Sequence, residues 1–150
     1  MRFNPYSADR EGRKALQAVS AHVAAGPLDT SILRLVEVRV SQLNGCAFCL
    51  QMHADEAREL GVSQGKLDTV AGWADDPLFD DRERAALRLA EDVTLIGQHG
   101  SRVSDATWDH ARSAFSDEEL ANLLLGIGMI NFWNRVNVAV EMPPARKPPA

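Results

Sequence analysis

The chain lacks several features that would place it in a specialised class of protein. Its 150 residues include only two cysteines. A domain of this size can bury about 68–70% of its unfolded surface, so it needs no disulfide scaffold. Its 16 Lys and Arg are outnumbered by 21 Asp and Glu, and no basic cluster interrupts the mixture, so we expect no nucleic-acid partner. The remaining composition, 45% hydrophobic and 25% charged, is that of an ordinary soluble domain.

Long apolar segments are missing as well. The longest one, residues 123–130, is far shorter than the roughly 20 residues that span a bilayer. The first 14 residues are polar and charged, without the apolar core of about 7–15 residues that a secretory signal needs. We therefore expect no membrane segment and a cytoplasmic location. In that compartment a cysteine pair is more often catalytic, redox-sensing or metal-binding than structural.

Alternating β-strand patterns are also absent, while proline and glycine punctuate the chain at intervals that suit helices. The apolar spacing predicts a single all-α domain over residues 1–142, followed by a disordered, proline-rich tail over residues 143–150. About seven helices are expected, over residues 8–24, 30–43, 46–60, 63–73, 80–98, 104–115 and 116–140. The fifth should bury a stripe that includes Leu89 and Ile96, and Ser116 with Glu119 forms a capping box at the start of the last.

The last expected helix is apolar nearly all round. Such a helix must be central in its domain or covered by another subunit. Gly126 and Gly128 would each cost it about 1 kcal/mol relative to Ala, so we expect the backbone of a neighbouring helix to approach closely there. We infer that the protein is a homo-oligomer.

Two cysteines and a histidine gather in the segment 46–53, Cys-Ala-Phe-Cys-Leu-Gln-Met-His. At about 100° per helical residue, Cys46, Cys49 and His53 share one narrow stripe. Cys49 and His53 form an i, i+4 pair, in which the imidazole can accept the thiol proton or stabilise the thiolate. These three residues are our candidate catalytic groups, and the chemistry requires no cofactor.

The position of the pair relative to the helix start gives a second effect. With Asn44 as the expected N-cap, Cys46 falls in the first turn, where free N–H groups favour an anion. In such settings the pKa of a cysteine falls from about 8.5 into the range of roughly 3.5–7.5. The helix start favours Cys46 as the nucleophile and His53 favours Cys49, so the spacing leaves this choice open.

Glu37 is the fourth candidate. On one continuous helix it would point away from the cysteine stripe, but the break at Asn44-Gly45 allows its carboxylate to fold back as a proton acceptor. It lies within an apolar run, and buried charge requires a reason.

Other thiol chemistries fit less well. Covalent haem attachment requires histidine at position 50, where the chain has Leu50, and a thioredoxin requires a βαβ pattern. A structural zinc site usually draws on four Cys or His ligands, which this segment does not supply.

The motif also carries a resemblance. Residues 40–53, Val-Ser-Gln-Leu-Asn-Gly-Cys-Ala-Phe-Cys-Leu-Gln-Met-His, continue into Glu-Ala-Arg-Glu-Leu-Gly at 56–61, and Ile-Asn-Phe-Trp-Asn-Arg stands at 130–135. Together they resemble the carboxymuconolactone decarboxylase family in its alkyl hydroperoxidase D-like branch, over residues from about 29 to 140. The resemblance implies an all-helical trimer or hexamer with antioxidant thiol activity. It further implies that Cys49 attacks the hydroperoxide, that Cys46 resolves the sulfenic acid, and that Glu37 and His53 relay protons.

The sequence therefore predicts a thiol-dependent peroxidase that takes electrons from a dithiol protein or a low-molecular-weight thiol. Three alternatives stay open: a general thiol–disulfide oxidoreductase, a redox sensor or binding protein without turnover, and a lactone decarboxylase-like enzyme.

Overall fold

The computed structural model describes residues 1–144, apart from the side chain of His99, and these residues are helical, with no strand among them. The all-α prediction is confirmed. Of the predicted tail, residues 145–150 lie outside the described residues. Among the helices of residues 1–144, none combines the length and the hydrophobicity that a bilayer span requires.

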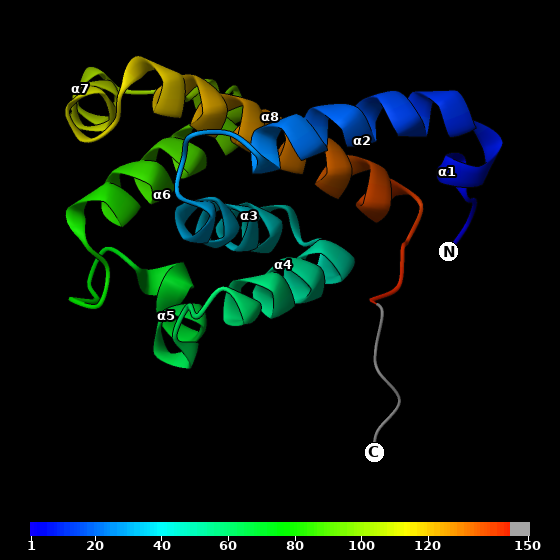
Figure 1. The fold of residues 1–150 in the computed structure, drawn as a ribbon, viewed down its shortest axis with the longest axis horizontal. Coiled ribbons are helices and arrows are strands. Elements are labelled where there is room, and N and C mark those ends of the chain that lie inside the picture. Colours follow the sequence, from blue (N-terminus) through cyan, green and yellow to red (C-terminus); the bar gives the residue numbers. More distant parts are fainter. Residues whose placement is uncertain (145–150) are drawn as a thin grey trace.

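The described chain forms eight α-helices and two short 3₁₀ helices (Figure 1). In order they are α1 (Pro5–Ala8), α2 (Arg10–Ala24), α3 (Thr30–Asn44), α4 (Ala47–Glu59), α5 (Gln64–Thr69), η1 (Val70–Gly72), α6 (Asp81–Thr94), η2 (Gln98–Gly100), α7 (Asp105–Ala114) and α8 (Asp117–Ala139). The capping box of Ser116 and Glu119 at the start of α8 is present.

Three of the predicted helices differ clearly from the structure. The fourth, expected over residues 63–73, is α-helical over Gln64–Thr69 and continues as the 3₁₀ turn η1. The first is preceded by the one-turn helix α1, because Asp9 ends that turn and its side chain then caps α2 by accepting the N–H of Gly12. The fifth ends at Thr94 rather than residue 98, since the chain turns at Gly97, which adopts a left-handed φ of 83°. Ile96 falls beyond the helix and is 56% exposed, so its predicted place in the apolar stripe is wrong.

The long helix α8 crosses beneath α2 in Figure 1 and packs against α2, α3, α4, α6 and α7. A Cβ atom added at Gly126 would lie 2.7 Å from Cδ1 of Leu33 in α3, so a side chain of α3 packs directly on this glycine. At Gly128 a Cβ would meet nothing within 4 Å in the single chain, so the approach expected there stays a prediction. Leu125 and Phe132 of α8 are exposed in the single chain, while the predicted subunit contact stays a prediction.

The first residues of the chain are joined to the end of α8. The N–H of Arg2 donates to the carbonyl of Val140 at 2.8 Å, and the Arg2 guanidinium pairs with Glu141. The ring of Tyr6 in α1 lies 5.6 Å from that of Trp133. This docking places α1 beside the C-terminal end of α8, at the right of Figure 1, and brings the Tyr6 side chain to one end of the site described next.

Candidate active site

The turn between α3 and α4 sets the position of both cysteines. Gly45 adopts a left-handed φ of 69°, which ends α3 after Asn44. Its N–H donates to the carbonyl of Gln42, and the next N–H donates to that of Ser41. The Asn44 side chain donates to Asn131 and Asn134 of α8, at 2.9 and 3.1 Å. Asn44 is therefore the last residue of α3, and its predicted role as the N-cap of α4 is wrong.

Cys46 itself is the N-cap of α4. Its Sγ accepts the N–H of Cys49 at 3.3 Å, in the way that a serine or aspartate oxygen caps other helices. The stabilisation of an anion by a helix start, which we expected for a first-turn residue, thus acts directly on this sulfur. Cys46 and Cys49 form a disulfide with a Cα–Cα separation of 5.4 Å, and both are buried.

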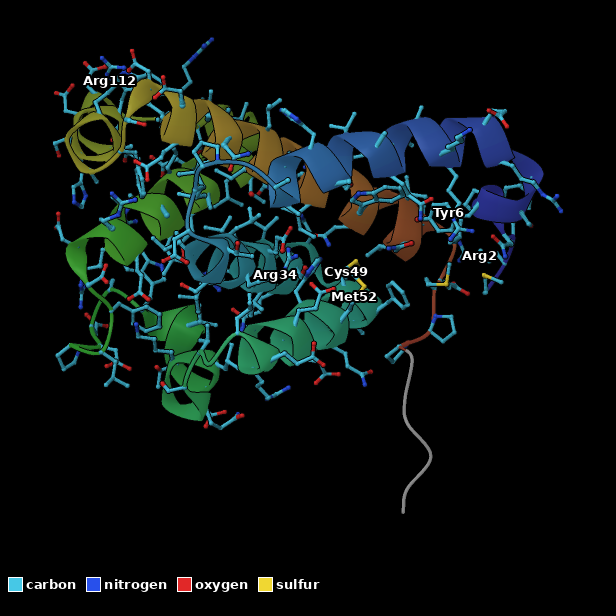
Figure 2. All side chains as sticks on the ribbon, viewed as in Figure 1. Arg2, Tyr6, Arg34, Cys49, Met52 and Arg112 are labelled. Carbon is cyan, nitrogen blue, oxygen red and sulfur yellow. A yellow bond between two sulfur atoms is a disulfide. The ribbon has the colours of Figure 1, made fainter. Side chains whose placement is uncertain are left out.

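A cavity of about 530 Å³ adjoins the pair, and we call it the Cys49 cavity. Cys49, His53 and Glu37 line it, together with apolar side chains that include Phe48, Met52, Met129, Ile130 and Trp133. Among the described residues that line it, Cys49 is present and Cys46 is not. Figure 2 shows Cys49 and Met52 on α4, close to Arg34 of α3. Of the two sulfurs, that of Cys49 is the one placed to meet a substrate in this cavity.

Glu37 reaches the cysteine helix across the break. Helices α3 and α4 pack side by side, and Oε2 of Glu37 lies 3.1 Å from Nδ1 of His53. The expected folding-back of this carboxylate is therefore present in the structure, with His53 as its partner. Both side chains are buried.

Two further charged residues, which were not among the predicted site residues, complete the cluster. Arg34 forms ion pairs with Glu37 and with Glu56, whose Oε2 is 2.9 Å from Arg34 Nε. Glu56 Oε2 also lies 3.1 Å from His53 Nδ1. The hydrogen bond with His53, aided by the charge of Arg34, holds the pKa of Glu56 below its ordinary value, against the opposing effect of partial burial. The i, i+3 spacings of Arg34 from Glu37 and of Glu56 from His53 could have pointed to both.

The structure also places a donor on the Cys49 sulfur. Asn137 of α8 donates from Nδ2 to Cys49 Sγ at 3.3 Å, and Tyr6 donates its hydroxyl proton to Asn137 Oδ1 at 2.5 Å. These contacts join residues 88 and 131 positions apart, so no local pattern in the sequence could have indicated them.

Glu37, His53 and Glu56 have potential metal-ligand atoms that lie within 4.8 Å of one another. The Arg34 guanidinium already pairs with both carboxylates, so a metal cation would have to displace a charge that the fold supplies. The arrangement is better suited to holding and moving protons. Two carboxylates at Nδ1 fix that nitrogen as the proton-bearing one, which leaves Nε2 of His53 free to exchange a proton.

Comparison with known proteins places this site in a family. Residues 11–92 match the Carboxymuconolactone decarboxylase family. Uncharacterized protein YdfG of Bacillus subtilis (strain 168) is 32% identical over 146 residues, which cover 97% of this chain and 98% of that protein.

Solved structures agree with this assignment. ATU0492 of Agrobacterium tumefaciens, a protein of unknown function provisionally assigned to antioxidant defence as AhpD, has a TM-score of 0.91 and 34% identity, with 97% and 99% of the two chains covered. The debrominase Bmp8, solved as a cysteine-to-alanine variant in complex with 2,3,4-tribromopyrrole, is 17% identical with a TM-score of 0.77 over 90% of this chain and 71% of that one, which shows a shared fold alone. The chain therefore belongs to the carboxymuconolactone decarboxylase family and has an alkyl hydroperoxidase D-like fold.

Proposed function

We propose that the protein is a thiol-dependent peroxidase that reduces hydroperoxides through the Cys46–Cys49 couple. One observation carries this proposal: Cys49, already paired with Cys46, opens on a cavity that it shares with the buried His53–Glu37 pair. Family membership and the antioxidant assignment of ATU0492 support it.

The two sulfurs have different surroundings, and we assign them different roles for that reason: Cys49 attacks the peroxide and Cys46 resolves the product. In the reduced protein the Cys49 thiolate attacks one peroxide oxygen and the O–O bond breaks. The products are Cys49 sulfenic acid and an alkoxide, which takes a proton to become the alcohol. The Cys46 thiol then attacks the sulfenic sulfur, forming the disulfide and releasing water. The hydroperoxide is reduced by two electrons, and the cysteine pair is oxidised by two.

His53 and Glu37 are the proposed proton relay. His53 lines the cavity and keeps Nε2 available, so it can take the thiol proton and return it to the departing alkoxide. Glu37, buried and anionic beside Nδ1, stabilises the imidazolium that exists between these two transfers.

Reduction of the disulfide depends on the same difference between the sulfurs: Cys49 lines the cavity, and Cys46 caps the helix. A donor dithiol that enters the cavity attacks Cys49 Sγ, and Cys46 leaves as a thiolate stabilised by the N–H of Cys49 at the helix start. The second donor thiol then displaces Cys49, and the donor departs as a disulfide. The donor would be a dithiol protein or a low-molecular-weight thiol, and we propose that the protein works as a cytoplasmic trimer or hexamer.

The test uses Cys46→Ser and Cys49→Ser with one equivalent of organic hydroperoxide, followed by mass spectrometry of the intact protein. We expect a disulfide in the wild type, a sulfenic acid on Cys49 in Cys46→Ser, and no rapid oxidation in Cys49→Ser. Thiol-dependent turnover should be lost in both variants. Turnover that persists in both would refute the proposal and favour a lactone decarboxylase-like activity. Rapid exchange with model disulfides, but no reaction with peroxide, would favour a general thiol–disulfide oxidoreductase.

A further inference from the structure

Asn137 is a buried polar side chain that neither the motif nor the proposed proton relay uses. It is 5% exposed and lies on α8, where the helix passes the start of α4. Its two side-chain polar atoms have separate partners: Nδ2 donates to Cys49 Sγ at 3.3 Å, and Oδ1 accepts the Tyr6 hydroxyl at 2.5 Å. Asn137 also lines the Cys49 cavity.

The partner on the far side fixes which way the amide faces. A carboxamide can present either its oxygen or its NH₂ group to a neighbour, and the two choices have opposite effects on a thiolate. Because Oδ1 is held by the Tyr6 hydroxyl, the N–H faces the sulfur. Burial raises the pKa of Tyr6, against a smaller opposite effect of Arg13, so this phenol keeps its proton at neutral pH and remains a donor.

We propose that Asn137 is the hydrogen-bond donor that holds Cys49 as a thiolate, and that Tyr6 is the positioning residue that orients its amide. This rests on the proposed function in one respect, namely that Cys49 is the attacking thiol. Asn137 touches the reacting sulfur and is thus a catalytic residue in this scheme. Each sulfur then has one N–H donor of its own: Cys46 takes it from the backbone of α4, and Cys49 takes it from α8.

The hydrogen bond from Asn137 would assist the first step of the proposed reaction, the attack of the Cys49 thiolate on the peroxide. A hydrogen bond to an anion is stronger than one to a neutral sulfur, so the donor favours the thiolate over the thiol and lowers the pKa of Cys49. Cys49 is the third residue of α4, and the capping N–H of this first turn goes to the sulfur of Cys46 rather than to its own. The contact from α8 therefore supplies to Cys49 the kind of stabilisation that Cys46 receives from its own helix.

The test measures the pKa of each thiol alone, without peroxide. In a Cys46→Ser background, the rate of Cys49 alkylation by iodoacetamide is followed against pH by mass spectrometry, with Asn137 intact or changed. Asn137→Leu removes the donor with little change in size, and we expect the pKa of Cys49 to rise by about one unit, a tenfold loss of thiolate below the pKa. Asn137→Asp places a negative charge beside the sulfur and should raise it further. Tyr6→Phe keeps the ring and should raise the pKa of Cys49 less, so that the thiolate population below the pKa falls by a factor of about three.

A matched control separates this role from general disturbance of the fold. In a Cys49→Ser background, Asn137→Leu should leave the pKa of Cys46 unchanged, because its donor belongs to the backbone of α4. An unchanged Cys49 pKa in folded Asn137→Leu overturns the proposal, as does an equal shift of both cysteines. An unchanged Cys49 pKa in Tyr6→Phe overturns the positioning role of Tyr6. If Asn137→Leu does not fold, the same result in Tyr6→Phe overturns the whole proposal. Peroxide turnover is assayed separately, so the proposed function can fail while these pKa shifts are still observed.

Discussion

The two carboxylates that meet at His53 make the sharpest test of the relay, because they have the same contacts and differ in burial. Each has an oxygen 3.1 Å from Nδ1 of His53, and each pairs with Arg34. The Glu37 side chain is 12% exposed and that of Glu56 is 38% exposed. Replacing one at a time by glutamine removes a charge and keeps the shape, so Glu56→Gln is a matched control for Glu37→Gln.

Burial sets the expected magnitudes. Removing one partner of a fully buried ion pair costs about 3–5 kcal/mol of unfolding free energy. Arg34 retains Glu56 when Glu37 is neutralised, so we expect Glu37→Gln to cost less, about 1–3 kcal/mol. Glu56 is only partly buried, which puts the cost of Glu56→Gln at about 0–1 kcal/mol. General acid–base catalysis contributes a factor of about 10²–10⁴, so peroxide reduction should slow by at least about a hundredfold in Glu37→Gln and by less than tenfold in Glu56→Gln.

Both quantities are measured on the same preparations. Stopped-flow oxidation of the reduced protein gives the rate constant for peroxide, and urea unfolding gives the free-energy difference. Equal rate losses in the two variants would show that both carboxylates contribute equally through their negative charge, and that the buried one has no special role. A wild-type rate in folded Glu37→Gln would remove Glu37 from the mechanism altogether.

Two further predictions concern stability. Gly126→Ala should destabilise the fold by about 1–2 kcal/mol, because its Cβ would meet Leu33 at 2.7 Å and overpack the core. Gly128→Ala should stabilise the fold by up to about 1 kcal/mol, because its Cβ meets nothing within 4 Å. Thermal melts that show no difference between the two variants would contradict the packing described for α8. The lowered pKa of Glu56 means that its ionised form stabilises the fold at neutral pH and that this contribution is lost as pH falls from about 5 through the lowered value. The unfolding free energies of wild type and Glu56→Gln should therefore converge on acidification, and a constant difference down to about pH 3 would refute this.

The helix content and the core of the site were predictable because they depend on local spacing. The stripe of Cys46, Cys49 and His53 follows from three residues within two turns of one helix, and the break at Gly45 follows from a residue that tolerates positive φ. The limits of the helices were less predictable. Asn44 had the chemistry of an N-cap, but three-dimensional packing gave its amide to Asn131 and Asn134 instead.

The residues around the cysteines also fall into two classes: those that local spacing indicates and those that only tertiary packing brings to the site. Arg34 and Glu56 stand at helical spacings from Glu37 and His53, so the pattern contained them although their significance depended on α3 and α4 packing side by side. Asn137 of α8 contacts Cys49, and Tyr6 of α1 contacts Asn137, so only the docking of α1 and α8 completes this chain of hydrogen bonds. A single sequence carries no direct record of such contacts.

The reactivity of the two cysteines depends on different parts of the chain. The CxxC spacing and the cap at Cys46 are properties of α4 and the turn before it, so every chain with that segment would have them. The donor on Cys49 depends on α8, and its orientation depends on α1. The residues before α1 are held to those just after α8 by the exposed pair of Arg2 with Glu141 and by the backbone hydrogen bond from Arg2 to Val140. Exposed ion pairs contribute little, so the packing of Tyr6 against Trp133 must supply most of the attachment. Relatives with the same motif and a different first helix should therefore share the thiol couple and differ in how readily Cys49 ionises.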